Sequence, residues 1–274
     1  VTVTDADLVY TYSDPDKNCN VQSACSDGKY VYLTIERPVY SGSAYQYGEC
    51  QIVKVDPKTW ETVKISGWLL TNHSNDITYN SKTGELLVTH CYNNVKTSDV
   101  DERYTVTAVN PQTLEKIRDD QVPVKDISSG GIYALDYNAE KKLYVAGISG
   151  FRFALLNPDL SQKSVFTGVT SYIKQMIYTS GTRIYANNWD DQNLRNYISS
   201  YDWNGNYTGG YYINGLSMEG EGLFQHDGQF YMACIPSERG GAVIYRLNGI
   251  KEERSGLELK PGSEANNKID WGDF

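Results

Sequence analysis

The stretch that decides the fold reads GKYVYLTI over residues 28–35 and QIVKVDPKTWETV over residues 51–63. It predicts a β-strand, a connection, a second strand, a tight turn and a third strand, because Tyr, Val, Ile and Thr suit a pleated surface. The turn starts at Asp56-Pro57, where Pro presets one backbone angle and Asp can hydrogen-bond to its own backbone. The rest of the chain repeats this pattern.

The turn that begins at Asp56 recurs four more times. Each copy follows a predicted strand, and the copies lie at residues 110–113, 157–160, 202–205 and, in eroded form, 247–249. A second hairpin precedes each copy, with turns near residues 26–28, 81–84, 139–142, 180–181 and 226–228. Each unit therefore has four strands. Four-stranded units of about 40–50 residues repeated along a chain are the signature of a β-propeller.

The last unit lacks a convincing fourth strand, since residues 251–254 read KEER and are polar throughout. Leu8–Ser13 reads as an outermost strand that has no unit of its own. We therefore predict that this N-terminal strand completes the last blade and closes the ring; the alternative is an open ring with a frayed N-terminus. The predicted fold is all-β: a five-bladed β-propeller of four-stranded antiparallel blades over residues 1–274, with a tail at about 255–274 that is peripheral or partly disordered.

Two patterns within the first unit resemble a known group of repeats. The pattern DG-Y-Y at residues 27–32, followed by I-V-D-P-T-E at residues 52–61, resembles quinoprotein-like and YVTN-type propeller repeats. The resemblance covers nearly the whole chain and points to no single family. It implies the fold rather than an activity, because those families share architecture and little chemistry.

Composition excludes some classes of partner. The net charge is −9 and the sequence pI about 4.9, and no run of Lys or Arg offsets this charge, so we expect no nucleic-acid partner. No apolar stretch approaches the length that crosses a membrane. The chain starts at Val1 and contains 23 Tyr, which favours a secreted or cell-surface bacterial protein. We expect a monomer with no cofactor.

Five cysteines leave two interpretations open. Cys19, Cys25 and Cys50 lie in one unit, where a local disulfide among them is an option. Cys91 and Cys234 fall inside or at predicted strands, which favours buried free thiols. No CxxC pair is present, which argues against a structural zinc site.

Candidate site residues follow from the predicted topology. In a propeller blade the first strand begins, and the second ends, on the same face of the ring, and ligand sites collect there. Gln22, Glu36 and Arg239 are among the polar residues on this face. From the face we select as ligand-binding candidates His73, Asn75, His90, Tyr133, Arg152, Lys174, Gln175, Asn188, Trp189 and Glu219. Asp76 and Glu221 are the candidate catalytic acids, should the protein be an enzyme.

Three functions remain open. The first is binding of a small polar molecule or glycan over the axis, where Trp189, Tyr133, Tyr92 and Phe151 could stack on sugar rings. The second is a glycoside hydrolase or lyase that uses the carboxyl groups of Asp76 and Glu221 as acid and base. The third is a protein-interaction scaffold.

A metal site is the remaining alternative on this face. His73, Asp76 and His90 match the ligand types of a catalytic metal site, but nothing in their spacing confirms one, and a polar channel wall explains them as well. We predict no metal ligands.

Overall fold

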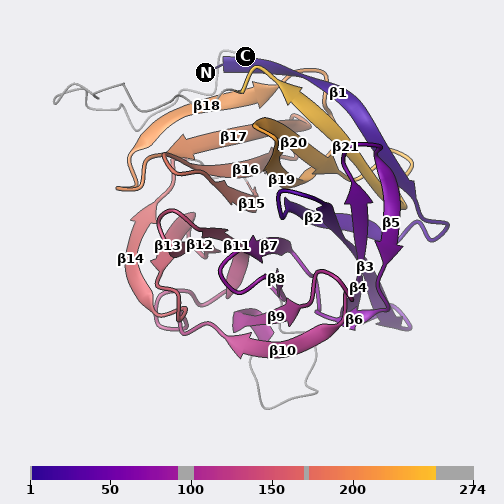
Figure 1. Cartoon of the computed structure of the whole chain (residues 1–274), viewed down its shortest axis with the longest axis horizontal. Helices are drawn as coiled ribbons and strands as arrows, with labels where there is room; N and C mark the ends of the chain where they lie inside the picture. The colour runs from indigo at the N-terminus through magenta and orange to yellow at the C-terminus, as the bar shows by residue number, and fades with distance from the viewer. Residues whose placement is uncertain (1, 92–101, 170–172, 251–274) are drawn as a thin grey trace.

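The computed structural model describes residues 2–91, 102–169 and 173–250, apart from the side chains of residues 2–4, 45, 173 and 174. Over these ranges the chain is a β-propeller, as predicted. Its strands pair into antiparallel sets of four that surround a common axis (Figure 1). We call each set a blade and number the blades along the chain.

The described strands form five blades. The first contains β2 (Asn20–Ser26), β3 (Val31–Ser41), β4 (Ala44–Asp56) and β5 (Glu61–Ile65), with β6 (Leu69–Leu70) also paired to β4. The second contains β7 (Asp76–Asn80), β8 (Glu85–Thr89), β9 (Thr105–Val109) and β10 (Lys116–Gln121), with the 3-10 helix η1 (Glu102–Tyr104) before β9. The third contains β11 (Ile132–Asn138), β12 (Leu143–Ile148), β13 (Arg152–Leu156) and β14 (Gln162–Thr167).

The fourth blade contains β15 (Ile173–Thr179), β16 (Ile184–Asp190), β17 (Arg195–Tyr201) and β18 (Tyr207–Ile213). The fifth contains β19 (Gly220–His226), β20 (Gln229–Cys234), β21 (Gly241–Asn248) and, from the other end of the sequence, β1 (Thr2–Ser13).

The outer turns use the chemistry that the repeat predicted. The side-chain Oδ1 of Asp56 accepts a hydrogen bond from the Lys58 amide at 2.9 Å. Asn110 and Asp202 do the same for the amides two residues ahead of them, at 2.8 Å and 2.9 Å. A side chain that satisfies its own turn fixes the turn without help from the rest of the fold.

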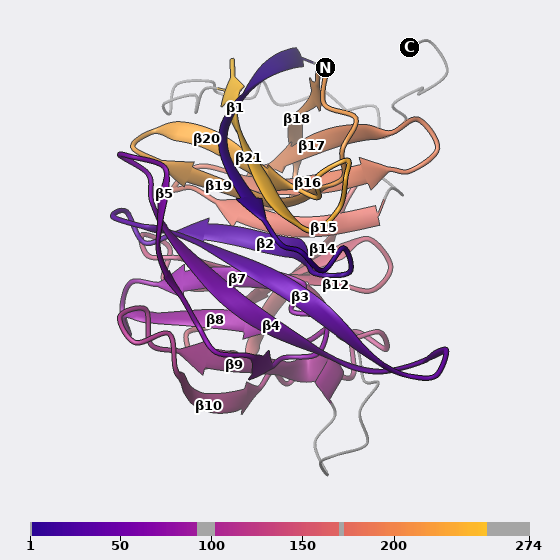
Figure 2. The ribbon, with the colours of Figure 1, turned by 90° about the vertical axis from the view of Figure 1, so that its right-hand side faces the viewer.

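The N-terminal strand closes the ring, which confirms the prediction for Leu8–Ser13. β1 runs antiparallel to β21, with register from Asp5 opposite Asn248 to Ser13 opposite Gly241. The strand begins earlier than predicted, at Thr2, and its first residues also pair in parallel with β18. Figure 2 shows β1 lying across the outside of β21. The predicted tail at 255–274 lies outside the described residues.

The innermost strands β2, β7, β11, β15 and β19 contact one another in a closed circuit around the axis. The core lies between the blades rather than inside one layer, because both faces of each blade are covered by neighbours. The described residues give one buried cluster for each pair of adjacent blades. Burial on both faces explains why a middle strand such as β12 is apolar through most of its length, whereas the innermost strands β2 and β7 also bury polar side chains near the axis.

The cysteines correct one interpretation. All five are free and buried, so Cys19, Cys25 and Cys50 form no local disulfide. Burial raises the pKa of Cys25 and Cys234 well above the usual thiol value, with nearby carboxylates adding to the shift. These thiols therefore behave as small apolar groups. None of the helices in the described ranges is long and apolar enough to cross a membrane.

Candidate ligand site at the axis

Four of the five innermost strands carry a β-bulge near their first residues. The extra residues are Gln22, Tyr133, Gln175 and Glu221. A bulge leaves one residue out of the ladder and re-aims its side chain. In the second blade Asn75 precedes β7, and its Nδ2 donates to the carbonyl oxygens of Tyr133 at 2.5 Å and Gln175 at 3.2 Å. We call these five residues the axial ring.

Three carboxyl groups gather beside this ring where the fifth blade meets the first. Glu221 belongs to the ring, Glu219 directly precedes β19, and Glu36 lies in β3. The Nε2 of Gln175 donates to Oε1 of Glu219 at 2.5 Å. The Nδ1 of His73 lies 3.8 Å from Oε1 of Glu36. We call Gln22, Glu36, Glu219 and Glu221 the axial acidic site.

Three side chains of this site are buried without hydrogen bonds. Gln22, Glu36 and Glu221 are only 6%, 6% and 4% exposed. Within the described ranges no group forms a hydrogen bond with these three side chains; the His73 ring lies 3.8 Å from Glu36, beyond hydrogen-bond distance. Their polar atoms still reach solvent. In the described chain the side-chain polar atoms that are both inaccessible to solvent and without a hydrogen-bond partner are Arg37 Nε and Asn187 Oδ1, and neither belongs to these three residues.

The surroundings favour the neutral form of Glu221 and Glu219. Burial raises the pKa of Glu221 well above its usual value; the charges of Glu219 and Glu36 add to this shift, and Arg239 opposes it. Burial also raises the pKa of Glu219, while the hydrogen bond from Gln175 and the charges of Arg239 and His73 hold it down. Neighbouring carboxyl groups repel one another when ionised, so this cluster contains both ionised and protonated carboxyl groups.

Asp76 has a different role from Glu221. Its Oδ1 accepts hydrogen bonds from the Ser23 hydroxyl at 2.6 Å and the Ile77 amide at 2.9 Å, and its Oδ2 accepts one from the Leu135 amide at 2.9 Å. These donors lie on the innermost strands of the first three blades. Burial raises the pKa of Asp76 well above its usual value, against the effect of these hydrogen bonds. Asp76 thus ties three blades together, and this engagement argues against a catalytic role.

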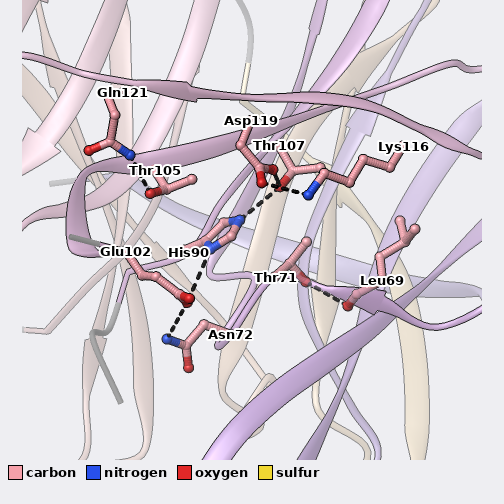
Figure 3. Close-up of polar contacts among 10 residues, drawn as sticks. All are labelled: Leu69, Thr71, Asn72, His90, Glu102, Thr105, Thr107, Lys116, Asp119 and Gln121. Atoms are coloured by element: carbon pink, nitrogen blue, oxygen red, sulfur yellow. Dashed lines mark hydrogen bonds and ion pairs between the residues drawn. The ribbon is translucent and has the colours of Figure 1, made fainter. Parts of the chain in front are cut away.

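His90 belongs to a network inside the second blade (Figure 3). Its Nε2 lies 2.8 Å from the Thr107 hydroxyl, which in turn donates to Asp119 at 2.6 Å. Because that hydroxyl proton goes to Asp119, Nε2 of His90 is the donor in the first contact. The Nδ1 faces Oε2 of Glu102 at 3.5 Å, and Asn72 donates to the same oxygen at 3.1 Å. These contacts hold His90 between strands.

The metal alternative is therefore not supported by geometry. His73 contacts Glu36, His90 contacts Thr107 and Glu102, and the Asp76 oxygens accept from Ser23, Ile77 and Leu135, so the three proposed ligands do not converge. In the described part of the chain no group of three or more His, Cys, Asp or Glu side chains could hold a metal ion.

The remaining candidates divide by their contacts. Arg152 donates to the carbonyl oxygens of Ser149 and Ile127 beside the third blade, and Asn188 donates to backbone carbonyls inside the fourth. Trp189 is only 6% exposed, which leaves it little surface for a ligand. Among the aromatic residues predicted to stack on sugars, Tyr133 is half-buried at the ring and Phe151 is exposed. The side chain of Lys174 and all of Tyr92 lie outside the described residues.

Gln22 and Glu36 were not selected from the sequence, although both lie on the predicted face. One signal could have identified Gln22: it stands two residues before Ala24, as Tyr133 does before Leu135 and Gln175 before Ile177, at the same place in each unit. Glu36 has no equivalent acid in the other units, so a repeat alignment could not distinguish it.

Comparisons with known proteins give the fold and no family. No protein-family model and no curated protein sequence matches the chain. Among solved structures, the glutaminyl cyclase of Myxococcus xanthus matches with a TM-score of 0.58 at 12% identity, over 90% of this chain and 97% of that one. The Cps50 (Swd1) β-propeller domain of Myceliophteria thermophila matches with a TM-score of 0.47 at 10% identity, over 88% and 99%. At these identities the first likeness shows the β-propeller fold alone, and the second is too weak to argue from.

Proposed function

We propose that this propeller binds a small polar ligand, such as a glycan or another hydroxyl- or amine-bearing molecule, at the axial acidic site, and that it works outside the cytoplasm. The observation that carries the proposal is the set of three buried side chains without hydrogen bonds: Gln22, Glu36 and Glu221. They stand on adjoining blades and reach solvent at one end of the axis.

The physical argument concerns satisfaction of buried polar groups. At least about 90% of buried polar groups in folded proteins have a hydrogen-bond partner, and for groups that reach solvent this partner can be water. Gln22 and Glu221 have no hydrogen-bond partner among the described residues, and Glu36 has only the longer contact with His73, so a ligand can replace water at these groups without breaking protein hydrogen bonds. A carboxyl group accepts hydrogen bonds and also donates one when it is protonated, and the Gln22 amide can donate or accept, so the matching ligand presents hydroxyl or amine groups.

The test is a glycan array probed with the purified chain, compared with its Glu221→Gln variant. Saturable binding by the unaltered chain that the variant loses supports the proposal. The control is Glu61→Gln, which changes an exposed acid on β5 by the same chemistry and should bind normally. No binding to any glycan or amino-sugar probe, or binding that survives Glu221→Gln, would contradict it.

A second candidate function is enzymatic, and the raised pKa of Glu221 favours it. A carboxyl group that holds its proton closer to neutral pH can act as a general acid or base, and perturbed groups of this kind gather at active sites. The predicted pair of Asp76 with Glu221 is less suitable, because both oxygens of Asp76 are engaged. Glu219 or Glu36 is the better second carboxyl group. The Myxococcus xanthus glutaminyl cyclase lends support, since it is an enzyme on a similar scaffold.

This candidate is tested by mass spectrometry of a peptide with N-terminal glutamine and of an aryl glycoside, each incubated with the chain. Turnover of either that disappears in Glu221→Gln and persists in Glu61→Gln supports an enzyme. Binding without turnover of any probe leaves the first proposal in place and contradicts this one.

A further inference from the structure

A cavity of about 270 Å³ lies at the opposite end of the axis from the axial acidic site. Its walls come from the last residues of all five innermost strands, for example Ser26, Asp136 and Thr179. The axial ring stands at the first residues of the same strands, so the two places are separated by the length of a strand. We call this the lower cavity.

The lower cavity is negatively charged. Two carboxyl groups line it, Asp27 and Asp136, and none of its lining residues is Lys, Arg or His. Burial raises the pKa of Asp136 to about 6, against hydrogen bonds from Thr179 and Thr78. Above that pH Asp136 carries a negative charge, and none of the residues that line the cavity carries a positive one.

The hydrogen bonds of Asp136 restrict the kind of cation that fits. Its Oδ1 accepts from the Thr78 hydroxyl at 2.6 Å, and its Oδ2 accepts from the amide and the hydroxyl of Thr179 at 2.7 Å and 2.6 Å. A carboxylate has about four acceptor positions, so little capacity remains for a new donor. The charge itself is still uncompensated. This combination favours a cation that is attracted by charge and donates no hydrogen bonds.

Aromatic residues are among the other residues that line the lower cavity. Tyr79 and Tyr178 are half-buried, whereas Tyr137 and Phe224 are only 8% and 1% exposed and offer it little ring surface. Tyr137 is 8% exposed, and no described residue forms a hydrogen bond with its hydroxyl group. Rings of this kind attract cations through their negative faces, and quaternary ammonium groups are recognised in this way. At about 30 Å³ per water molecule, the volume equals roughly nine waters, which admits a compact ligand.

We propose that the lower cavity binds a small quaternary ammonium compound, held by the charge of Asp136 and by the rings of Tyr79 and Tyr178. The site is separate from the axial acidic site and does not depend on the function proposed there. A quaternary nitrogen has no proton to donate, so it matches a carboxylate that already accepts three hydrogen bonds.

The test is isothermal titration of the full chain with choline, compared with 3,3-dimethylbutan-1-ol, its neutral isostere. Choline should saturate one site, and the isostere should bind at least about tenfold more weakly, because it lacks the charge that the rings and Asp136 attract. Asp136→Asn should weaken choline binding by a similar factor, and Glu221→Gln should leave it unchanged.

A second variant keeps the test decisive if Asp136→Asn loses its fold by circular dichroism. Tyr79→Leu removes a ring from the wall and should weaken choline binding while leaving the isostere nearly unaffected. The proposal is overturned if choline gives no saturable binding at millimolar concentration, if the isostere binds equally well, or if Glu221→Gln rather than Asp136→Asn or Tyr79→Leu removes the binding.

Discussion

Two buried acids at the axis should respond in opposite ways to the same substitution. Asp76 and Glu221 are 1% and 4% exposed, both lie on innermost strands, and burial raises the pKa of each. Asp76 accepts three hydrogen bonds, whereas Glu221 accepts none from the described residues. We predict that Asp76→Ala destabilises the propeller and that Glu221→Ala does not.

The magnitude follows from the donors that each substitution leaves behind. Asp76→Ala removes the partner of the Ser23 hydroxyl and of the Leu135 amide, and a buried donor without a partner costs roughly 1–3 kcal/mol. The Ser23 hydroxyl can rotate toward another acceptor, so we expect a loss of about 2–4 kcal/mol. For a domain of this size, each kcal/mol lowers the melting temperature by about 2–4 °C. Glu221→Ala leaves no hydrogen-bond donor without its partner and removes a buried acid, so we expect no loss of stability.

The pH dependence gives an independent check on Glu221. Its pKa in the folded chain is raised above the unfolded value, so its favourable contribution is present at low pH and is lost as pH rises through the folded pKa. Glu221→Gln cannot ionise and escapes that loss. The variant should therefore gain stability relative to the unaltered chain as pH rises, and the two should converge below the unfolded pKa.

Thermal unfolding followed by circular dichroism over a range of pH measures all three variants. Equal melting temperatures for Asp76→Ala and the unaltered chain would show that the three hydrogen bonds contribute nothing. A large destabilisation by Glu221→Ala would show that Glu221 supports the fold, and the axial acidic site would then lose its central residue.

The remaining predictions concern closure and covalent or metal support. Deleting residues 2–13 should expose the edge of β21 and lower the melting temperature by several degrees or more; an unchanged curve would contradict closure by β1. Gly241→Ala should destabilise more than Gly28→Ala, because both have positive φ but only a Cβ at Gly241 would lie 1.9 Å from the Tyr12 carbonyl oxygen; equal melting temperatures would refute this. A chelator should leave the melting temperature unmoved, and a large drop with stoichiometric metal by elemental analysis would overturn that expectation. A reducing agent should also have no effect, since the five cysteines are free.

The sequence was informative about the fold because its strongest signals are local. A turn such as that at Asp56 or Asp202 is fixed by its own side chain, so its copies can be recognised without knowing what surrounds them. Counting the copies gives the units, and a unit that lacks a strand predicts closure from the other end of the chain. The pairing of β1 with β21 follows from that count and from no local feature of either strand.

The site was predicted less completely because its chemistry depends on which neighbours are present. Asp76 and Glu221 look alike in sequence, as acids at the start of innermost strands. They differ because Ser23 and Leu135 donate hydrogen bonds to Asp76. Both donors come from other blades, so the spacing of residues in the sequence does not reveal these contacts. We also predicted that His90 lines the axial pocket, whereas its ring contacts Thr107 and Glu102 within the second blade.

A comparison of equivalent positions separates what the fold requires from what a ligand requires. The column Leu33, Thr89, Ala146, Ala186 and Ala233 is fully buried in all five blades and is mostly small, because each member is pressed against an innermost strand. Packing therefore limits the residues that this column accepts. The axial ring occupies an equally repeated place, yet it holds Gln, Asn, Tyr, Gln and Glu.

Packing does not explain that variety, because a bulged residue stands outside the ladder and its backbone position accepts many side chains. Where the units differ although the backbone is the same, the difference is free to serve a ligand. The variety is not spread evenly around the ring: Asn75 and Gln175 form hydrogen bonds to other blades, whereas Gln22 and Glu221 lie on the neighbouring strands β2 and β19 and have no hydrogen bonds to described residues. Sites in symmetric scaffolds need such asymmetry, because a small ligand contacts a few blades and not all of them. We therefore propose that the ligand lies between the fifth blade and the first, beside the blade that β1 completes.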